Sequence, residues 1–428
     1  MLKLIKEQLT ISSTMKNSIR CIAAKVNEEN GGKELKNDKS IKFRSEKQKK
    51  MIPEEKKGGI FLEISNYLKS IKSEYLIEHL PKSFCRSVKN SQKIYLVNRK
   101  VAEKCAMLLK DELTKDSDMF IAEAGPGFGF LTENLLKMSI EKIYLYEPLK
   151  PLLIPNSLLR NIIKNNSDRL VLRECDLLEM WSMVFREAQG QTNLVEKMLH
   201  GTKTRKWKDK PYMTVIGTLS SENFIKQLIM DVLSQSGFTK RGRVIFYLLI
   251  EPLIWERYIA LKNTSDYKSR SIMFQTMFNY EKIDEFSRKD FLPWPYVSNQ
   301  RKQKKFKNIQ NLTYDNLYLV RIEPKIDLFD RISHKEIFPF YYFLKHHFQK
   351  THTRVIPALE NWIPGCGPRL IMNNFNIFTE FQDLDVEQLL KLYKEFSSFP
   401  EFEECYFLNS SSSYYDSVED AFHEMGFN

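Results

Sequence analysis

The sequence contains no CxxC pair and no long apolar run. Its six cysteines are spread widely along the chain, which argues against a zinc ribbon or a disulfide scaffold and favours a reducing compartment. No stretch approaches the roughly 18–20 uncharged residues that a membrane-spanning helix needs. His346 and His347 are neighbours on an expected helix, so their side chains face different directions. We therefore expect a soluble protein with no metal site and no membrane partner.

The alternation of short apolar runs with helical patterns indicates the fold class. The chain has 428 residues, too many for one ordinary domain, and its 42% apolar content can form a sizeable core. Apolar runs separated by helical patterns are typical of an α/β fold, in which helices cover both faces of a parallel sheet. We expect strands at 118–123, 142–147, 169–173, 212–217 and 243–250, and helices at 131–138 and 222–235.

Charge is distributed unevenly along the chain. The net charge is +12, yet residues 1–57 hold 15 Lys/Arg against 8 Asp/Glu, and residues 380–428 hold 2 against 12. A basic body with an acidic tail favours a polyanionic partner for the body, although solvated surface charge explains the same numbers. We expect the acidic tail, 401–428, to be mobile.

The first 27 residues are amphipathic and contain five basic residues but one acid, Glu7. This pattern, which lacks a secretory apolar core, is typical of a mitochondrial transit peptide. Residues 28–59 are polar and unpatterned, which favours a flexible basic linker. The remaining boundaries are an α/β domain at 60–330 with a polar insertion at 187–211, and a helical domain at 331–400.

A glycine-rich turn follows the first expected strand. In IAEAGPGFGF, Glu123 precedes Gly125, Gly127 and Gly129, and glycines there let a backbone approach a ligand closely. A dinucleotide fold needs its third glycine one place later, where Phe130 stands. An acid before such a loop is instead the pattern of S-adenosylmethionine enzymes, with Glu123 and the loop amides facing the amino acid part of the cofactor.

Two more acids follow the next two expected strands. Glu147 lies 20 residues beyond Gly127, where a carboxylate can accept both ribose hydroxyls, and Asp176 can accept the adenine amino group. Each acid alone is as well explained by a helix cap or a solvated turn. Three acids at three strand ends, in register with a glycine loop, together predict a cofactor pocket at the carboxyl edge of the sheet.

From about residue 92 to 345 the sequence resembles the ribosomal RNA adenine dimethyltransferase family. QKIYLVNRKVAEK is similar to the N-terminal cofactor motif of that family, with Ile94 and Leu96 at cofactor-contacting places, and EAGPGFG, YLYEP and CDLL are similar to its following motifs. The resemblance implies a class I S-adenosylmethionine-dependent methyltransferase fold with a small helical C-terminal domain. The basic N-terminus, the insertion and NLYLVRIEPKIDLF resemble the mitochondrial transcription factor B branch, second paralogue, whose members serve the single-subunit mitochondrial RNA polymerase.

The sequence departs from the family at the catalytic motif. Active members carry Asn-Leu-Pro-Tyr after the fourth strand, where this chain has Gly217, Thr218, Leu219 and Ser220. The Asn amide oxygen accepts hydrogens of the adenine amino group as positive charge develops, and the Tyr ring stacks on the flipped base. We place Gly217 among the cofactor-contacting residues and expect no catalytic residue in this motif. Residual methylation would be slow.

A basic run follows two aromatic residues in LPWPYVSNQRKQKKFK. Arg301, Lys302, Lys304 and Lys305 can neutralise phosphates, and aromatic rings can stack on unpaired bases. The alternative is a disordered charged loop. The resemblance implies that Arg301 and Lys302 contact DNA. The run KTRKWKDK (203–210) with Trp207 is a weaker candidate.

The resemblance, taken with these observations, implies a mitochondrial transcription initiation factor of the matrix nucleoid that helps the mitochondrial RNA polymerase to melt promoter DNA. The mitochondrial HMG-box transcription factor and ribosomal RNA are further candidate partners. Two alternatives stay open: an active adenine dimethyltransferase of the small-subunit ribosomal RNA, and a structural RNA-binding protein of the mitochondrial ribosome.

Overall fold

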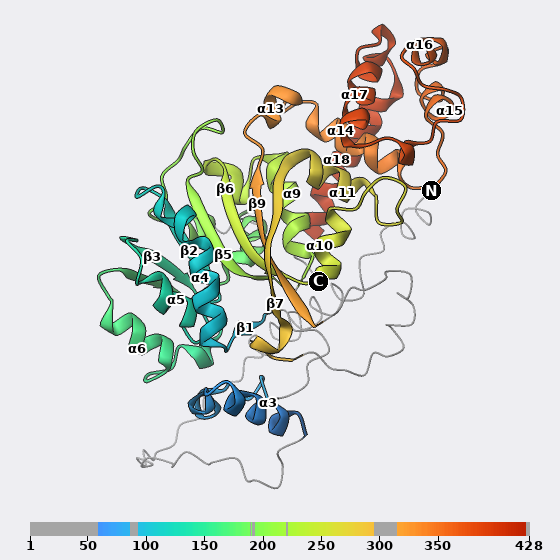
Figure 1. Ribbon diagram of the computed structural model, residues 1–428. Coiled ribbons are helices and arrows are strands. Elements are labelled where there is room, and N and C mark those ends of the chain that lie inside the picture. The colour runs from blue at the N-terminus through green and yellow to red at the C-terminus, as the bar shows by residue number, and fades with distance from the viewer. Residues whose placement is uncertain are drawn as a thin grey trace, which may run out of the picture.

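The computed structural model describes residues 59–85, 93–188, 190, 193–219, 221–294 and 315–424. A twisted sheet lies at the centre, with helices on both faces and the C-terminal helices gathered at one end (Figure 1). The expected transit peptide, nearly all of the expected linker, Ser220 and the basic run 301–307 lie outside the described residues.

Seven strands form the main sheet in the order β4-β3-β2-β5-β6-β9-β7. The first five are parallel to one another, and β9 runs antiparallel to both β6 and β7. The strands are β2 (Phe120–Ala124), β3 (Ile143–Tyr146), β4 (Leu170–Arg173), β5 (Met213–Leu219), β6 (Val244–Ile250), β7 (Phe278–Ser287) and β9 (Asn316–Pro324). The expected α/β class is confirmed, and the five expected strands lie within two residues of the observed bounds.

Helices cover both faces of this sheet, which explains why its central strands are apolar throughout. Every residue of β6 is buried. On one face, Ile216 and Leu249 pack in a core with α4 (Arg99–Thr114), α5 (Phe130–Leu135) and α6 (Leu158–Asn165). On the other, Val215 and Leu248 pack against α9 (Asn223–Ser234), α10 (Pro252–Tyr258) and α11 (Ser269–Met277).

A smaller cluster lies at the N-terminal end of the described chain. Helix α3 (Gly59–Ser70) and the 3-10 helix η2 (Glu74–His79) pack against the two-stranded antiparallel sheet of β1 (Tyr95–Leu96) and β8 (Phe291–Leu292). Phe128, from the glycine-rich turn, is buried in the same cluster. The segment before α4 is therefore fixed beside the carboxyl edge of the main sheet.

The C-terminal helices share one apolar core with the sheet. Phe340 and Phe343 belong to the same buried cluster as Phe274 and Phe246. No helix among the described residues is long and apolar enough to cross a membrane. The helices of this part are α13 (Leu328–Arg331), α14 (Ile337–His347), α15 (Val355–Glu360), α16 (Gly367–Met372), α17 (Val386–Ser397) and α18 (Tyr406–Glu424).

The expected mobility of the acidic tail is wrong for residues 401–415. Phe407 of α18 is fully buried, and Phe402 is 7% exposed. The Phe407 ring lies 5.3 Å from that of Tyr342 on α14. The apolar residues between the acids anchor this part of the tail, and the charge count alone did not reveal them.

The insertion is held against the sheet. It contains α8 (Leu194–Met198) and follows α7 (Met180–Ala188). Arg173, at the end of β4, donates to the Tyr146 hydroxyl at 2.5 Å and to the carbonyl oxygens of Met198 and His200. Short 3-10 helices complete the fold: η3 (Lys150–Leu152), η4 (Leu177–Glu179), η5 (Gly237–Arg241), η6 (Arg288–Asp290), η7 (Phe381–Asp383) and η8 (Pro400–Phe402).

The weaker nucleic-acid candidate, 203–210, packs against the segment that follows β9. The Trp207 ring packs edge-on against Phe329, with ring centroids 4.7 Å apart, and its Nε1 donates to the Lys325 carbonyl at 3.0 Å. Lys203 and Lys208 each pair with an aspartate. Because the Trp207 ring packs against Phe329, it has a structural role. Nucleic-acid contact by the run 203–210 stays a prediction.

Candidate cofactor and nucleic-acid site

The glycine-rich turn has the backbone that its sequence predicts. Gly125, Gly127 and Gly129 all have positive φ angles of 71°, 62° and 82°. At Gly127 a glycine is also required by space, because an added Cβ would lie 2.8 Å from Cδ1 of the Tyr95 ring. The close approach at this turn is therefore made by a side chain of the protein itself.

Glu147, the predicted ribose acceptor, is fully buried. Its Oε2 accepts from the Gly127 amide at 3.0 Å, and its Oε1 accepts from the Leu149 amide at 2.8 Å and from the Tyr95 hydroxyl at 3.2 Å. Burial raises the pKa of Glu147 to about 7, although these hydrogen bonds oppose the rise. The carboxylate already has three donors.

Glu123, at the end of β2, is 3% exposed and accepts a hydrogen bond from the Thr132 hydroxyl at 2.7 Å. The pKa of Glu123 is raised to about 7, chiefly by burial; the Thr132 hydrogen bond opposes this rise and the neighbouring Glu147 adds to it. Two buried acids with pKa values near neutrality lie side by side at this edge. Such groups often mark functional sites, because burial is otherwise unfavourable for a carboxylate.

Asp176, the predicted adenine acceptor, caps the 3-10 helix η4. Its Oδ1 accepts from the Leu178 amide at 3.0 Å, and its Oδ2 lies 2.5 Å from Nζ of Lys93. The helix-cap explanation for this acid therefore holds, and an ion pair is added to it.

Residues 93–97, which we name the crossing segment, run over the carboxyl edge of the sheet. Three successive residues contact three strand ends: Lys93 pairs with Asp176 after β4, the Ile94 carbonyl accepts from the Thr218 hydroxyl on β5 at 2.6 Å, and Tyr95 bonds Glu147 after β3. The Val97 amide also donates to the Asp290 carbonyl at 2.8 Å. The crossing segment closes the edge where the cofactor is predicted.

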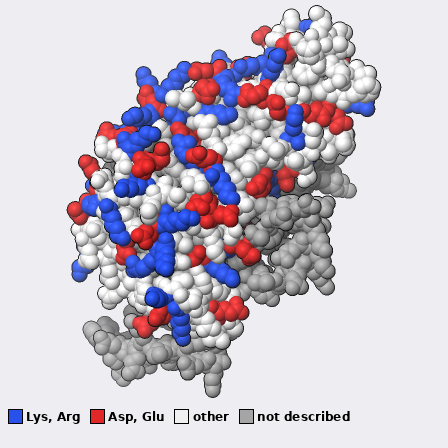
Figure 2. Space-filling model, in the orientation of Figure 1, with Lys and Arg blue, Asp and Glu red and all other residues white. Residues whose placement is uncertain are grey.

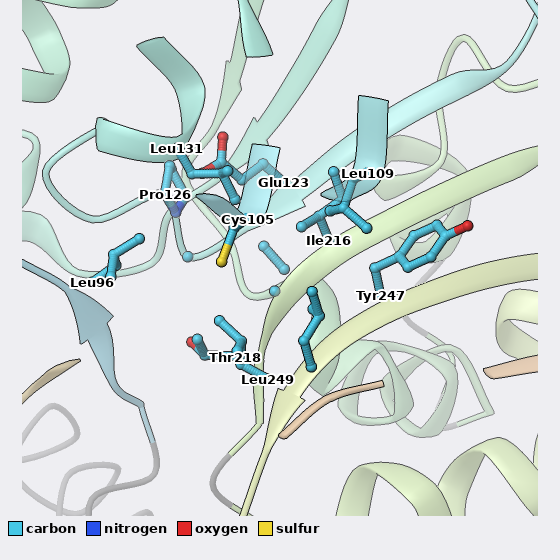
Figure 3. A pocket seen from close by; sticks show the side chains of 14 residues that line it. Leu96, Cys105, Leu109, Glu123, Pro126, Leu131, Ile216, Thr218, Tyr247 and Leu249 are labelled. Carbon is cyan, nitrogen blue, oxygen red and sulfur yellow. The ribbon is translucent and has the colours of Figure 1, made fainter. Parts of the chain in front are cut away.

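A small hollow, partly open to solvent, remains beside this segment. Figure 3 shows Leu96, Glu123 and Thr218 around it, together with apolar residues of α4 and of the sheet. Of the seven predicted cofactor residues, Leu96, Glu123, Gly125 and Gly217 line it, while Ile94, Glu147 and Asp176 do not.

These contacts test how well the residues fit S-adenosylmethionine. Glu123 and Gly125 face the hollow, as the amino acid part of the cofactor requires. The predicted acceptors for the ribose and the adenine, Glu147 and Asp176, are engaged by Tyr95 and Lys93. With the crossing segment in this position the residues do not fit the whole cofactor, and the cofactor roles stay predictions.

The altered catalytic motif ends strand β5. Gly217 pairs with Ala124 of β2, and an added Cβ would lie 3.1 Å from both the Cβ and the carbonyl oxygen of Ala124. Thr218 is bound to Ile94, and Leu219 is 4% exposed. The position that holds the amide in active enzymes is therefore packed against the neighbouring strand.

Sequence reasoning missed Lys93, Tyr95 and Thr132, and it missed the bond that Thr218 of the altered motif makes with Ile94. The signal for Tyr95 was its place between Ile94 and Leu96, since alternate residues of a strand point to opposite faces. The ring therefore had to face away from the two predicted contacts. Its partner, 52 residues further on, had no local signal.

The sheet order and the glycine turn define a class I methyltransferase-like protein. A family model for ribosomal RNA adenine dimethylase matches residues 88–398, so the chain belongs to that family. The expected resemblance is thereby confirmed.

Curated relatives are named after the same reaction. The chain is 26% identical over 385 residues to "Dimethyladenosine transferase 2, mitochondrial" of Drosophila melanogaster, covering 80% of this chain and 84% of that protein. It is 24% identical to the Rattus norvegicus protein of the same name, covering 57% and 62%. These names agree with the expected second mitochondrial paralogue.

Two solved structures are similar over 71% of this chain. One is a dimethyladenosine transferase from Plasmodium falciparum, with 16% identity, 97% of that chain covered and a TM-score of 0.43. The other is the 23S rRNA methyltransferase ErmE, with 14% identity, 100% covered and a TM-score of 0.37.

Proposed function

We propose that this protein is a mitochondrial transcription initiation factor, which holds melted promoter DNA for the mitochondrial RNA polymerase on a methyltransferase scaffold that has lost rapid catalysis. The observation that carries the proposal is the packing at Gly217. A Cβ added to this residue would lie only 3.1 Å from Ala124. No side-chain amide fits there without a shift of the neighbouring strand.

The chemistry of adenine methylation explains why this change matters. The adenine amino group is a poor nucleophile, and acceptors for its hydrogens stabilise the positive charge that develops on it. Losing one such group typically costs about 10²–10³ in rate. Gly217 supplies no acceptor side chain, and the Thr218 hydroxyl donates to the Ile94 carbonyl.

The basic run supports a nucleic-acid partner. It belongs to the segment that joins β8 to β9, and β9 begins at the carboxyl edge because it is antiparallel to β6. Shortly before β8, the Arg288 amide donates to the carbonyl of Asp315, just before β9, at 2.6 Å, so residues that flank this segment lie close together. Arg301, Lys302, Lys304 and Lys305 belong to the segment between these residues, and we propose that they contact the phosphates of the nucleic acid.

Localisation in the mitochondrial matrix is part of the same proposal. The relatives named above are called mitochondrial, and the basic, acid-poor residues 1–27 have the composition of a transit peptide. Binding of S-adenosylmethionine, in this view, is weak and limited by the crossing segment.

Run-off transcription with the cognate polymerase, with and without this protein, tests the proposal. We expect transcripts from a closed linear promoter only when the protein is present, and near-equal yields from a pre-melted template. Initiation on the closed promoter that is equally efficient without the protein would contradict the proposed function.

A second candidate is an active dimethyltransferase of the small-subunit ribosomal RNA. The names of the relatives and the retained glycine turn favour this second candidate. Transfer of tritiated methyl groups to a ribosomal RNA hairpin distinguishes the two candidates. The proposed function predicts transfer at least 10²-fold slower than a family member with the Asn motif, and dimethyladenosine formed at a comparable rate would promote the second candidate.

A further inference from the structure

Four positively charged side chains form a cluster near the residue that lies two positions beyond the altered motif, 217–220. None of the sites described above includes them. The centre of the cluster is Glu222, the residue before α9, which forms ion pairs with Lys226, Arg257 and Arg270. The Arg270 Nη1 lies 3.5 Å from Glu222 Oε1. Burial alone would raise the pKa of Glu222, but the three cations lower it below its usual value.

Positive charge exceeds negative charge in this cluster. Lys345, on α14, is exposed and forms no ion pair within the described residues. Its pKa is lowered, first because surrounding protein displaces water and then because Arg270 and Lys226 repel its charge. The second acid, Asp266, lies 3.9 Å from Arg257 Nε. Four cations thus share two acids.

The cluster is built at the carboxyl edge of the sheet. Glu222 follows β5 directly, and Arg257, Arg270 and Lys345 come from α10, α11 and α14, which pack together beside α9. It therefore lies on the same edge as Gly217, on the side of the C-terminal helices.

The two arginines keep donors available for a ligand. An arginine has five N–H donors in a planar fork that matches the oxygens of a phosphate. The side chains of Arg257 and Arg270 are 39% and 44% exposed. Glu222 contacts only the Nη1 group of each, so it orients the guanidinium groups without using up their donors.

We propose that Lys226, Arg257, Arg270 and Lys345 form a phosphate-binding site for single-stranded DNA, which guides the strand from the altered motif towards the C-terminal helices. This inference rests on the proposed function and adds to it a second strand contact, separate from the run at 301–305. Its ligand is a backbone phosphodiester, so binding there does not depend on the base sequence.

Equilibrium binding of the full chain to a fluorescent single-stranded DNA oligonucleotide, at several salt concentrations, tests the site. Replacing both arginines (Arg257→Gln with Arg270→Gln) should weaken binding roughly tenfold at 0.1 M salt. It should also flatten the slope of log K against log [salt] by about 1.4, since each phosphate contact to a single strand contributes about 0.7. The matched control is Lys137→Gln with Lys142→Gln, two exposed lysines at the opposite edge, which should change neither quantity.

A second variant guards against misfolding, because removing both arginines leaves Glu222 with one cation. Lys345→Gln orphans no acid, and it should weaken binding by several-fold with an unchanged melting temperature. Unchanged affinity and slope in both variants would overturn the phosphate site, while the proposed function would survive if Arg301→Ala with Lys302→Ala still reduced binding. A loss confined to RNA of the same sequence would also overturn it and would favour the methyltransferase candidate. Failure of the unaltered chain to bind DNA at all would instead remove the proposed function.

Discussion

The Tyr95 hydroxyl donates a hydrogen bond across 3.2 Å to the Glu147 carboxylate, which the sequence predicts as the acceptor of a ribose hydroxyl. Lys93, two residues earlier, neutralises the predicted adenine acceptor Asp176. A ligand that needs both acids must first displace the crossing segment. Its apparent affinity is then reduced by the fraction of molecules in which the segment is displaced.

The first prediction concerns these contacts. Tyr95→Phe with Lys93→Ala should strengthen binding of S-adenosylmethionine by about tenfold, because a hydrogen bond to a charged group contributes about 1.5 kcal/mol and 1.4 kcal/mol is tenfold in affinity. Isothermal calorimetry measures the change.

The matched control is Tyr212→Phe, which removes a buried hydroxyl that donates to the Phe238 carbonyl, in a core away from the carboxyl edge. It should leave the affinity unchanged. If the double variant binds no better than the unaltered chain, the crossing segment does not limit access to the cofactor.

Local sequence patterns predict only some of the residues that meet at this edge. The glycine turn and Glu123 were predictable because a strand, a turn and a helix follow one another directly. Leu96 and Gly217 also line the hollow, as the motifs indicated. Tyr95 with Glu147, and Lys93 with Asp176, are pairs from distant parts of the chain, and no periodicity encodes such contacts.

The acidic tail illustrates a different limit. The tail does carry a large net negative charge, but whether it folds depends on the apolar residues among the charges. Phe402 and Phe407 are buried against the C-terminal helices, so residues 401–415 are part of the fold.

The net charge of the whole chain is a similarly limited guide. The visible face of the molecule intermixes Lys/Arg with Asp/Glu (Figure 2), so the net charge of +12 does not create a surface of one sign there.

The second prediction concerns pH. Glu123 and Glu147 have pKa values of about 7 in the folded protein, above their ordinary value of 4.5. The folded state therefore binds more protons than the unfolded state between these values. Their contribution to stability is fully present below about pH 4.5 and is lost as pH rises through 7, by at most about 1.4 kcal/mol per pH unit for each group.

Urea unfolding at pH 5.5 and pH 7.5 measures this contribution. Glu147→Gln should reduce the difference in unfolding free energy between the two pH values, because a glutamine does not titrate. Glu141→Gln, at an exposed position, is the control for a change in net charge. An equal pH dependence in the Glu147 variant and the unaltered chain would contradict the raised pKa of this buried group.

The third prediction concerns Gly217. Gly217→Ala should lower the unfolding free energy by about 1–3 kcal/mol, because the new Cβ lies 3.1 Å from Ala124 and the strands must separate slightly. Ala124→Gly in the same molecule removes one of the two close contacts and should recover part of the loss. A double-mutant cycle in urea isolates this coupling. Strictly additive effects would mean that position 217 has room for a side chain, and the structural case against catalysis would weaken.

The fourth prediction concerns the basic run and the transcription role. Arg301→Ala with Lys302→Ala should weaken binding to melted DNA and flatten its salt slope by about 1.4, since two phosphate contacts to a single strand are lost. The same variant should reduce transcription from a closed promoter far more than from a pre-melted bubble. The bubble already supplies the strand separation that these residues are proposed to stabilise.

The variant that replaces Lys137 and Lys142 removes equal charge at the opposite edge and should transcribe both templates normally. Equal losses on both templates would assign Arg301 and Lys302 to polymerase docking or to folding. The DNA-holding role would then rest on the cluster around Glu222, whose arginine variant should in that case show the closed-promoter defect by itself.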